Sequence, residues 1–287
     1  MKLNDRLRIG SHILAARLKG SPAPLFVQYG LLNACNARCT YCEIPSRSSP
    51  DIPLSTHVRV LDEYLALGAK RIKFLGGEPL LYKELDRLVD HVNARGARSA
   101  IVTNGFLIPK QMDLIRRIDE VVISLDGDEA AHDHHRGKGT WKRAMAGIEA
   151  CYEAAIDFFI TAVVTDATVG DVDWLIDLGR RLRVMVNFQV VQTNEAYYGP
   201  HAKKCLPGDD FVRDAVQRIL AAKKAGAPVL FSVRSYEHTL NWHDYTVERV
   251  ERPGEVSPCA AGKYFVHHDA NGDIYPCFQH VGWFQPL

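Results

Sequence analysis

Residues 26–43 read FVQYGLLNACNARCTYCE, an apolar run that leads directly into three closely spaced cysteines. The first seven residues, rich in β-branched and aromatic side chains and flanked by turn formers, predict a strand. Cys35, Cys39 and Cys42 fall within eight positions, and an odd number of thiols cannot all pair as disulfides. Because soft thiolates select zinc, copper(I) or iron–sulfur clusters, the segment after the strand indicates a metal site.

The composition restricts the setting of this site. The chain has 287 residues and a formal net charge of +1, so no overall field favours nucleic acid as a partner. No apolar run approaches the ~20 residues of a membrane span, and the N-terminus lacks the order of a secretion signal. We therefore predict a cytoplasmic protein, in which thiols stay reduced and clustered cysteines bind metal more often than they form disulfides.

Five further strands and alternating helices follow the first strand. Apolar runs recur at about residues 71–77, 99–105, 120–127, 158–166 and 184–192, with amphipathic segments at 55–67, 81–96, 110–118, 140–154 and 172–183 between them. This alternation is typical of parallel βα units with right-handed crossovers. Six units are two short of a closed eight-unit barrel. We therefore predict an α/β fold, a partial (β/α)6 TIM-like barrel over residues 25–192.

The flanking segments differ from the barrel in character. Residues 1–24 predict a basic amphipathic helix, which either packs on the barrel or contacts an anionic membrane surface. Residues 193–258 predict a lid loop, at 194–207, and a linking helix at 209–224. Residues 259–287 predict a small extension, in which Asn271-Gly272 between apolar runs indicates a β-hairpin.

Several polar or glycine-rich turns fall where the predicted strands end, which is where parallel βα folds bind ligands. Cys35, Cys39 and Cys42 follow the first strand, GGEP (76–79) the second, TNG (103–105) the third and SLDG (124–127) the fourth. Structural zinc normally takes four ligands, whereas three thiolates can hold a [4Fe–4S] cluster with one iron open. A three-cysteine zinc site is the alternative.

C-x3-C-x2-C with Tyr41 before the last cysteine, followed one βα unit later by GGEP, resembles the radical S-adenosylmethionine (radical SAM) superfamily. The resemblance implies that the three cysteines ligate a [4Fe–4S] cluster whose open iron chelates SAM. It implies an electron donor such as flavodoxin or ferredoxin, and a 5′-deoxyadenosyl radical that abstracts hydrogen from the substrate. It also implies that the backbone of Gly76, Gly77 and Glu78 approaches the methionine amino group, and that Tyr41 packs near the adenine.

Further cofactor contacts are implied by position. Asn104, Ser124 and Asp126 would bind the ribose or carboxylate of SAM, and Arg136 its carboxylate, while Gln189 would lie over the adenine. The alternatives are a turn role for Asp126 and a solvated surface charge for Arg136. The neighbouring histidines are interpreted as polar loop residues rather than as a metal site: His132, His134 and His135.

Cys259 and Cys277 are separated by seventeen residues that include the predicted hairpin. This spacing resembles the SPASM or twitch extension of one radical SAM branch, and implies two ligands of an auxiliary [4Fe–4S] cluster; two buried core cysteines are the alternative. The sequence ends ten residues after Cys277, and the other thiols are Cys151 and Cys205. We therefore expect this chain to hold one complete cluster.

The resemblance predicts an enzyme of oxidoreductase or lyase type. About 25 residues precede the first strand, which favours a small-molecule or lipid-linked substrate over a ribosomal peptide, although a peptide-modifying enzyme of the SPASM branch stays an alternative. A SAM-dependent radical methyltransferase and a non-catalytic iron–sulfur protein are the others. The sequence identifies no general acid or base.

Overall fold

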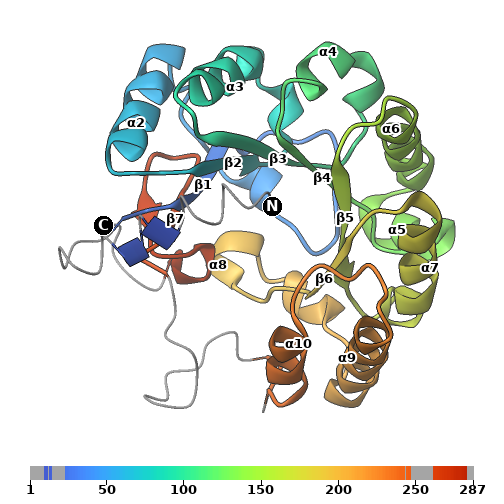
Figure 1. Cartoon of the computed structure of the whole chain (residues 1–287). Coiled ribbons are helices and arrows are strands. Elements are labelled where there is room, and N and C mark those ends of the chain that lie inside the picture. The colour runs from blue at the N-terminus through green and yellow to red at the C-terminus, as the bar shows by residue number, and fades with distance from the viewer. Residues whose placement is uncertain (1–9, 12, 15–22, 243, 247–260, 283–287) are drawn as a thin grey trace.

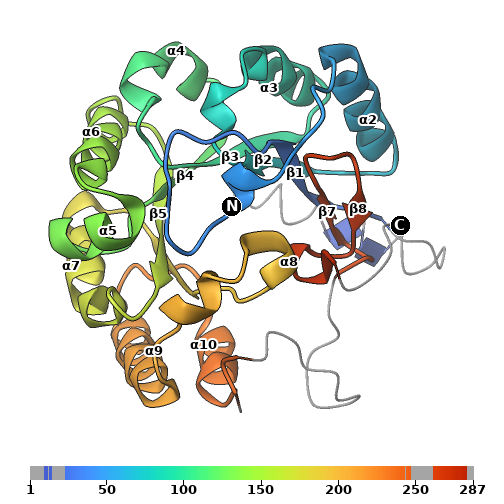
Figure 2. The ribbon, with the colours of Figure 1, turned by 180° about the vertical axis from the view of Figure 1, so that it is seen from behind.

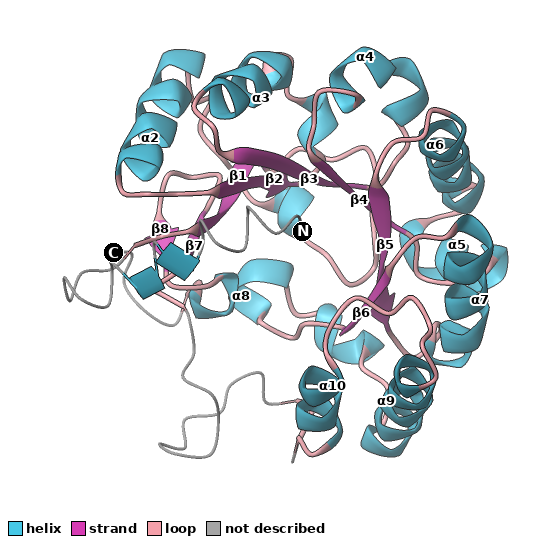
Figure 3. Cartoon of the chain, viewed as in Figure 1, coloured by secondary structure: helices cyan, strands magenta, loops and turns pink. Residues whose placement is uncertain are grey.

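The computed structural model describes residues 10, 11, 13, 14, 23–242, 244–246 and 261–282. The predicted N-terminal helix lies almost wholly outside these residues. Within them, the chain forms one curved sheet with helices on its outer face (Figures 1 and 3). No helix in the described ranges is long and apolar enough to cross a membrane.

The six predicted strands form as parallel neighbours in chain order. Alternate side chains such as Val27, Tyr29, Ile72 and Phe74 are buried against the outer helices, so each strand has one face in the main core. The sheet is open, and its order is β6-β5-β4-β3-β2-β1-β7-β8. The first six strands are β1 (Phe26–Leu32), β2 (Arg71–Gly76), β3 (Arg98–Thr103), β4 (Glu120–Ser124), β5 (Phe158–Val164) and β6 (Val186–Val190).

The helices of the βα units lie around the convex face of the sheet (Figure 1). Their buried residues, among them Leu61, Leu88 and Ile148, complete the core. The element after β3 is a short helix rather than the nine-residue one predicted. These helices are α2 (Leu54–Ala66), α3 (Leu85–Ala94), α4 (Met112–Ile115), α5 (Glu129–Arg136), α6 (Thr140–Glu153) and α7 (Val172–Leu182).

The segment after β6 contains more regular structure than the predicted lid loop. It forms α8 (Glu195–Tyr198) and a short 3-10 helix, Ala202–Cys205, on the concave side of the sheet, as Figure 2 shows. The predicted helix at 209–224 is confirmed as α9 (Asp209–Lys224), which packs against α7 and against α10 (Val233–Leu240).

The predicted hairpin is confirmed, but it belongs to the same sheet as the barrel. Strands β7 (Phe265–His268) and β8 (Ile274–Tyr275) are antiparallel, and Gly272 turns between them with a φ of 95°. Strand β7 pairs in parallel with β1, from Phe26 opposite Phe265 to Tyr29 opposite His268. The tail therefore lies beside the strand that leads into the cysteines.

Candidate active site

The three-cysteine loop leaves β1 on the concave side of the sheet (Figure 2). Cys35, Cys39 and Cys42 are half-buried and unpaired. The backbone N–H of Ala37 donates to Cys35 Sγ at 3.4 Å, which already directs one amide of the loop at a sulfur. Burial raises the pKa of Cys42 to about 12 and also raises that of Cys39. A bound metal is therefore needed to keep these buried thiols deprotonated.

The three sulfurs of the loop do not gather around one point. Across the described residues, one group of three or more metal-ligating side chains has all its ligand atoms within 4.8 Å of one another, and it does not contain Cys35, Cys39 or Cys42. Tetrahedral zinc, with Zn–S bonds of about 2.3 Å, requires sulfurs about 3.8 Å apart. The three sulfurs are therefore not arranged around a single ion, and three thiolates are a donor set that can hold a [4Fe–4S] cluster.

Gly76 and Gly77 allow the end of β2 to lie close against the cysteine loop. Gly77 N–H donates to Leu32 O at 2.7 Å, and Glu78 N–H donates to Ala34 O at 2.9 Å. A Cβ on Gly77 would overlap the Ala34 carbonyl, and one on Gly76, whose φ is 140°, would overlap that of Leu32. The glycines are thus required by the chain itself, because only a residue without a side chain permits this approach.

Glu78 fixes the geometry of two strand ends. Its fully buried carboxylate accepts hydrogen bonds from Thr103 Oγ1 (2.7 Å), Asn104 N (2.8 Å) and Leu80 N (3.1 Å). Burial raises its pKa to about 7, although these donors favour the charged form. The side chain of Glu78 therefore ties GGEP to TNG.

Asn104 connects the same strand end to the cysteine loop. Its Nδ2 donates to Asn36 Oδ1 at 2.7 Å and lies 3.9 Å from Cys35 Sγ, while its Oδ1 accepts from Phe106 N. The amide is therefore held at the edge of the predicted cluster site. This position is compatible with the cofactor contact predicted for Asn104.

Asp126, Arg136 and Tyr41 form one buried cluster. Asp126 accepts from Arg136 Nε (2.6 Å) and Nη2 (3.0 Å), from Tyr41 OH (2.8 Å) and from Val163 N (3.0 Å). Burial alone would raise the pKa of Asp126, but the Arg136 guanidinium and these hydrogen bonds hold it below its usual value. Asp126 is thus more than a turn residue, and its bonds to Arg136 use Nε and Nη2 but not Nη1.

The segment with the three histidines is a helix, so its interpretation as a polar loop was wrong. Asp128 caps α5 by accepting from Ala131 N at 2.9 Å. His132 is fully buried and its Nδ1 accepts from Asp126 N at 3.2 Å, while burial and the Arg136 charge lower its pKa to about 4. A neutral His132 therefore positions Asp126. Arg136 is likewise buried, and is not a solvated surface charge.

The last two predicted cofactor residues lie farther along the sheet. Ser124 is buried and pairs in register with Thr161 of β5. Gln189 is exposed on β6 and lines a mostly apolar cavity of about 480 Å³ between β6, α9 and α10. No described hydrogen bond joins Ser124 or Gln189 to the cluster around Asp126, and their cofactor roles stay predictions.

The tail approaches the site from the side of β1. Asp269, just after β7, is buried and forms an ion pair with the partly exposed Arg47, whose guanidinium also lies over the Tyr197 ring, 5.0 Å from its centroid. Burial opposes ionisation of Asp269, yet His267, whose Nε2 lies 3.8 Å from Oδ1, and the hydrogen-bonded Arg47 guanidinium lower its pKa to about 2. Cys277 is half-buried just after β8, whereas Cys259 lies outside the described residues. The auxiliary cluster therefore stays a prediction.

Sequence reasoning did not identify the surroundings of Thr40, inside the cysteine loop. Its hydroxyl lies 2.6 Å from His135 Nδ1 and 3.8 Å from Cys205 Sγ, and His135 Nε2 lies 3.0 Å from Asp166 Oδ1. The sequence signal for this group of residues was Cys205, a cysteine that belongs to neither predicted cluster. Asp166 and His135 lie 39 and 70 positions before Cys205, too far for a spacing motif to show.

The comparisons with known proteins agree with this site. The model of the radical SAM superfamily matches residues 29–179, more than half of the chain. The AdoMet-dependent heme synthase of Methanosarcina barkeri is 25% identical over 89% of this chain and 77% of its own length. The Fe-coproporphyrin III synthase of the same organism is 29% identical over 61% of this chain and 45% of its own length. The chain thus spans less than half of that second relative.

Solved structures support the fold. Streptococcus suis SuiB bound to S-adenosylmethionine matches with a TM-score of 0.71 and 19% identity, over 96% of this chain and 65% of SuiB. That structure contains the cofactor predicted here, and its sheet resembles this one across nearly all of the chain. With its three-cysteine loop held against GGEP, this chain belongs to the radical SAM superfamily, enzymes that use a [4Fe–4S] cluster and S-adenosylmethionine.

Proposed function

We propose that the chain reductively cleaves SAM and uses the resulting radical to abstract hydrogen from a small-molecule substrate. The observation that carries this proposal is the contact between the cysteine loop and the end of β2. Gly77 and Glu78 donate backbone hydrogen bonds to Leu32 and Ala34, so the segments expected to hold the cluster and the methionine group lie side by side.

Cys35, Cys39 and Cys42 would hold the cluster, which when bound supplies the electron that breaks the sulfonium bond of SAM. The protein's own part is to position the ligand. Arg136 Nη1 would bind the SAM carboxylate while Asp126 keeps the guanidinium in place. Asn104 would contact SAM from the end of β3.

The inner face of the barrel favours a substrate with an anionic group. Lys73 of β2 extends across the concave face, with Nζ 6.0 Å from the centroid of the Phe159 ring on β5. Burial and the neighbouring Arg71 lower the pKa of Lys73 to about 8. No described residue forms an ion pair with it, whereas Arg71 is paired with Glu120. A carboxylate or phosphate of a small substrate would pair directly with Lys73, which the Glu120 carboxylate attracts without forming an ion pair.

SAM consumption by reconstituted, reduced protein tests the reaction. We expect 5′-deoxyadenosine. S-adenosylhomocysteine would instead indicate a methyltransferase, and no SAM consumption a non-catalytic iron–sulfur protein; either result would overturn the proposal.

The substrate class is tested by the rate of 5′-deoxyadenosine formation with added candidates, namely anionic small molecules, lipid-linked acids and peptides. We expect stimulation by an anionic small molecule, and its loss in Lys73→Met at unchanged iron content. Stimulation by a peptide alone would favour the peptide-modifying alternative.

A further inference from the structure

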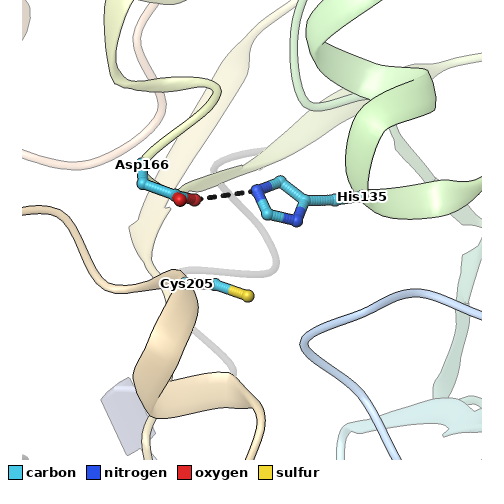
Figure 4. A group of neighbouring side chains, drawn as sticks. All are labelled: His135, Asp166 and Cys205. Carbon is cyan, nitrogen blue, oxygen red and sulfur yellow. Dashed lines mark hydrogen bonds and ion pairs between the residues drawn. The ribbon is translucent and has the colours of Figure 1, made fainter.

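Three side chains with different ligand atoms converge beside the cysteine loop without belonging to it. His135 is the penultimate residue of α5, Asp166 follows β5, and Cys205 ends the 3-10 helix Ala202–Cys205. Their nitrogen, oxygen and sulfur atoms all lie within 4.8 Å of one another, and Figure 4 shows them meeting from three separate segments. In the described part of the chain, no other such group occurs.

The backbone holds these residues in place. Asp166 N–H donates to Cys205 O at 2.9 Å, which fixes the 3-10 helix against the end of β5. Thr40 N–H donates to His135 O at 2.8 Å, which fixes α5 against the cysteine loop. His135 and Cys205 are buried, and Asp166 is half-exposed at the mouth of the group. The site therefore has a rigid interior and an accessible entrance.

The surroundings of His135 match those of a metal ligand. Metal-binding histidines use one ring nitrogen for the metal and donate the other N–H to a fixed acceptor. Thr40 Oγ1, 2.6 Å from Nδ1, is such an acceptor, which leaves Nε2 to face Asp166 at 3.0 Å. Metal binding would require Nε2 to give up its hydrogen bond to Asp166, whose carboxylate would then bind the same ion.

We propose that His135, Asp166 and Cys205 form a second metal site, for one divalent cation of the Zn²⁺ class, separate from the cysteine loop. Zinc bonds of about 2.0–2.3 Å place tetrahedral ligand atoms about 3.3–3.6 Å apart, so a thiol movement on the order of 1 Å completes the set. Binding releases the Cys205 thiol proton and leaves a fourth position for water or a substrate oxygen. Because Thr40 lies between Cys39 and Cys42, the ion would also clamp the 3-10 helix and α5 onto the cluster loop.

The test counts zinc in a full-length variant with Cys35, Cys39 and Cys42 replaced by alanine, so that the cluster loop cannot contribute. We expect about one zinc per chain after gel filtration, and a thiolate-to-cobalt charge-transfer band when Co²⁺ is added instead. Cys205→Ala in this background should remove the band and that zinc. Asp166→Asn, on a half-exposed side chain, should weaken zinc binding at least about tenfold while leaving the fold unchanged.

Cys151→Ala provides the matched control, because Cys151 is a buried thiol on α6 outside the group. It should retain both the zinc and the cobalt band. Equal zinc binding with and without Cys205 would show adventitious binding elsewhere and overturn the proposal. Absence of zinc from all variants would overturn it too, and would leave Asp166, His135, Thr40 and Cys205 as a hydrogen-bonded chain.

Discussion

The ion pair between Asp126 and Arg136 gives the sharpest test of how the site is built. Asp126→Asn keeps the shape of the side chain but removes its charge. Both groups are buried, with Asp126 fully inaccessible and Arg136 8% exposed, and the pair shares two hydrogen bonds of 2.6 and 3.0 Å. The variant leaves a guanidinium buried without a counter-charge, which costs about 3–5 kcal/mol. This is a large share of the ~5–15 kcal/mol that stabilises a typical folded protein.

Urea unfolding of the iron-free protein, followed by circular dichroism, measures this loss. The double variant Asp126→Asn/Arg136→Met removes both charges, so we expect it to be at least about 1 kcal/mol more stable than the sum of the single effects predicts. Glu63→Gln is the control, because the Arg59–Glu63 pair on α2 is about two-thirds exposed and should contribute about 0.5 kcal/mol or less. A loss below about 1 kcal/mol for Asp126→Asn, or strict additivity, would refute the reasoning.

Three further predictions address the loop, the strand end and the tail. Cys39→Ala should abolish the reactive cluster and 5′-deoxyadenosine formation, and retained product would contradict the ligand assignment. Gly77→Ala should destabilise the fold by about 1–3 kcal/mol in urea unfolding, because its Cβ would overlap the Ala34 carbonyl. Gly170→Ala, with open space around the Cβ, should cost far less in the same assay. The pKa of the Asp269 carboxyl is lowered to about 2, so its ionised form contributes fully to the free energy of unfolding above about pH 4. As the pH falls to 2, the protein should lose about 2 kcal/mol of that free energy. Unfolding curves of Asp269→Asn should lack this loss.

The sequence predicts the barrel well because its strands are local patterns. Each apolar run between Phe26 and Val190 ends close to where the periodicity places it. The helix α5 was missed because HDHHRG is polar by composition. Two of its buried side chains, His132 and Arg136, contact Asp126, and the Arg136 contact is an ion pair between residues ten positions apart.

Long-range contacts account for what the sequence could not show. The need for glycine at Gly77 comes from the Ala34 carbonyl, more than forty positions away, and not from a ligand alone. The approach of Cys205 to His135 depends on how the segment after β6 folds back, which no spacing encodes. The types of residue in the site were thus predictable, whereas their protein partners were not.

The parallel pairing of β7 with β1 has a consequence for how the chain folds during synthesis. Tyr29 of β1 pairs with His268, which the ribosome adds roughly 240 residues later. At about 5–20 residues per second, β1 keeps one unpaired edge for about 12–48 s after it emerges. An open strand edge is a template for pairing with other chains, so the nascent protein is exposed to aggregation until β7 arrives. The strand that carries the cysteine loop is thus made before the other strands of its sheet, and its second edge is filled only when β7 arrives.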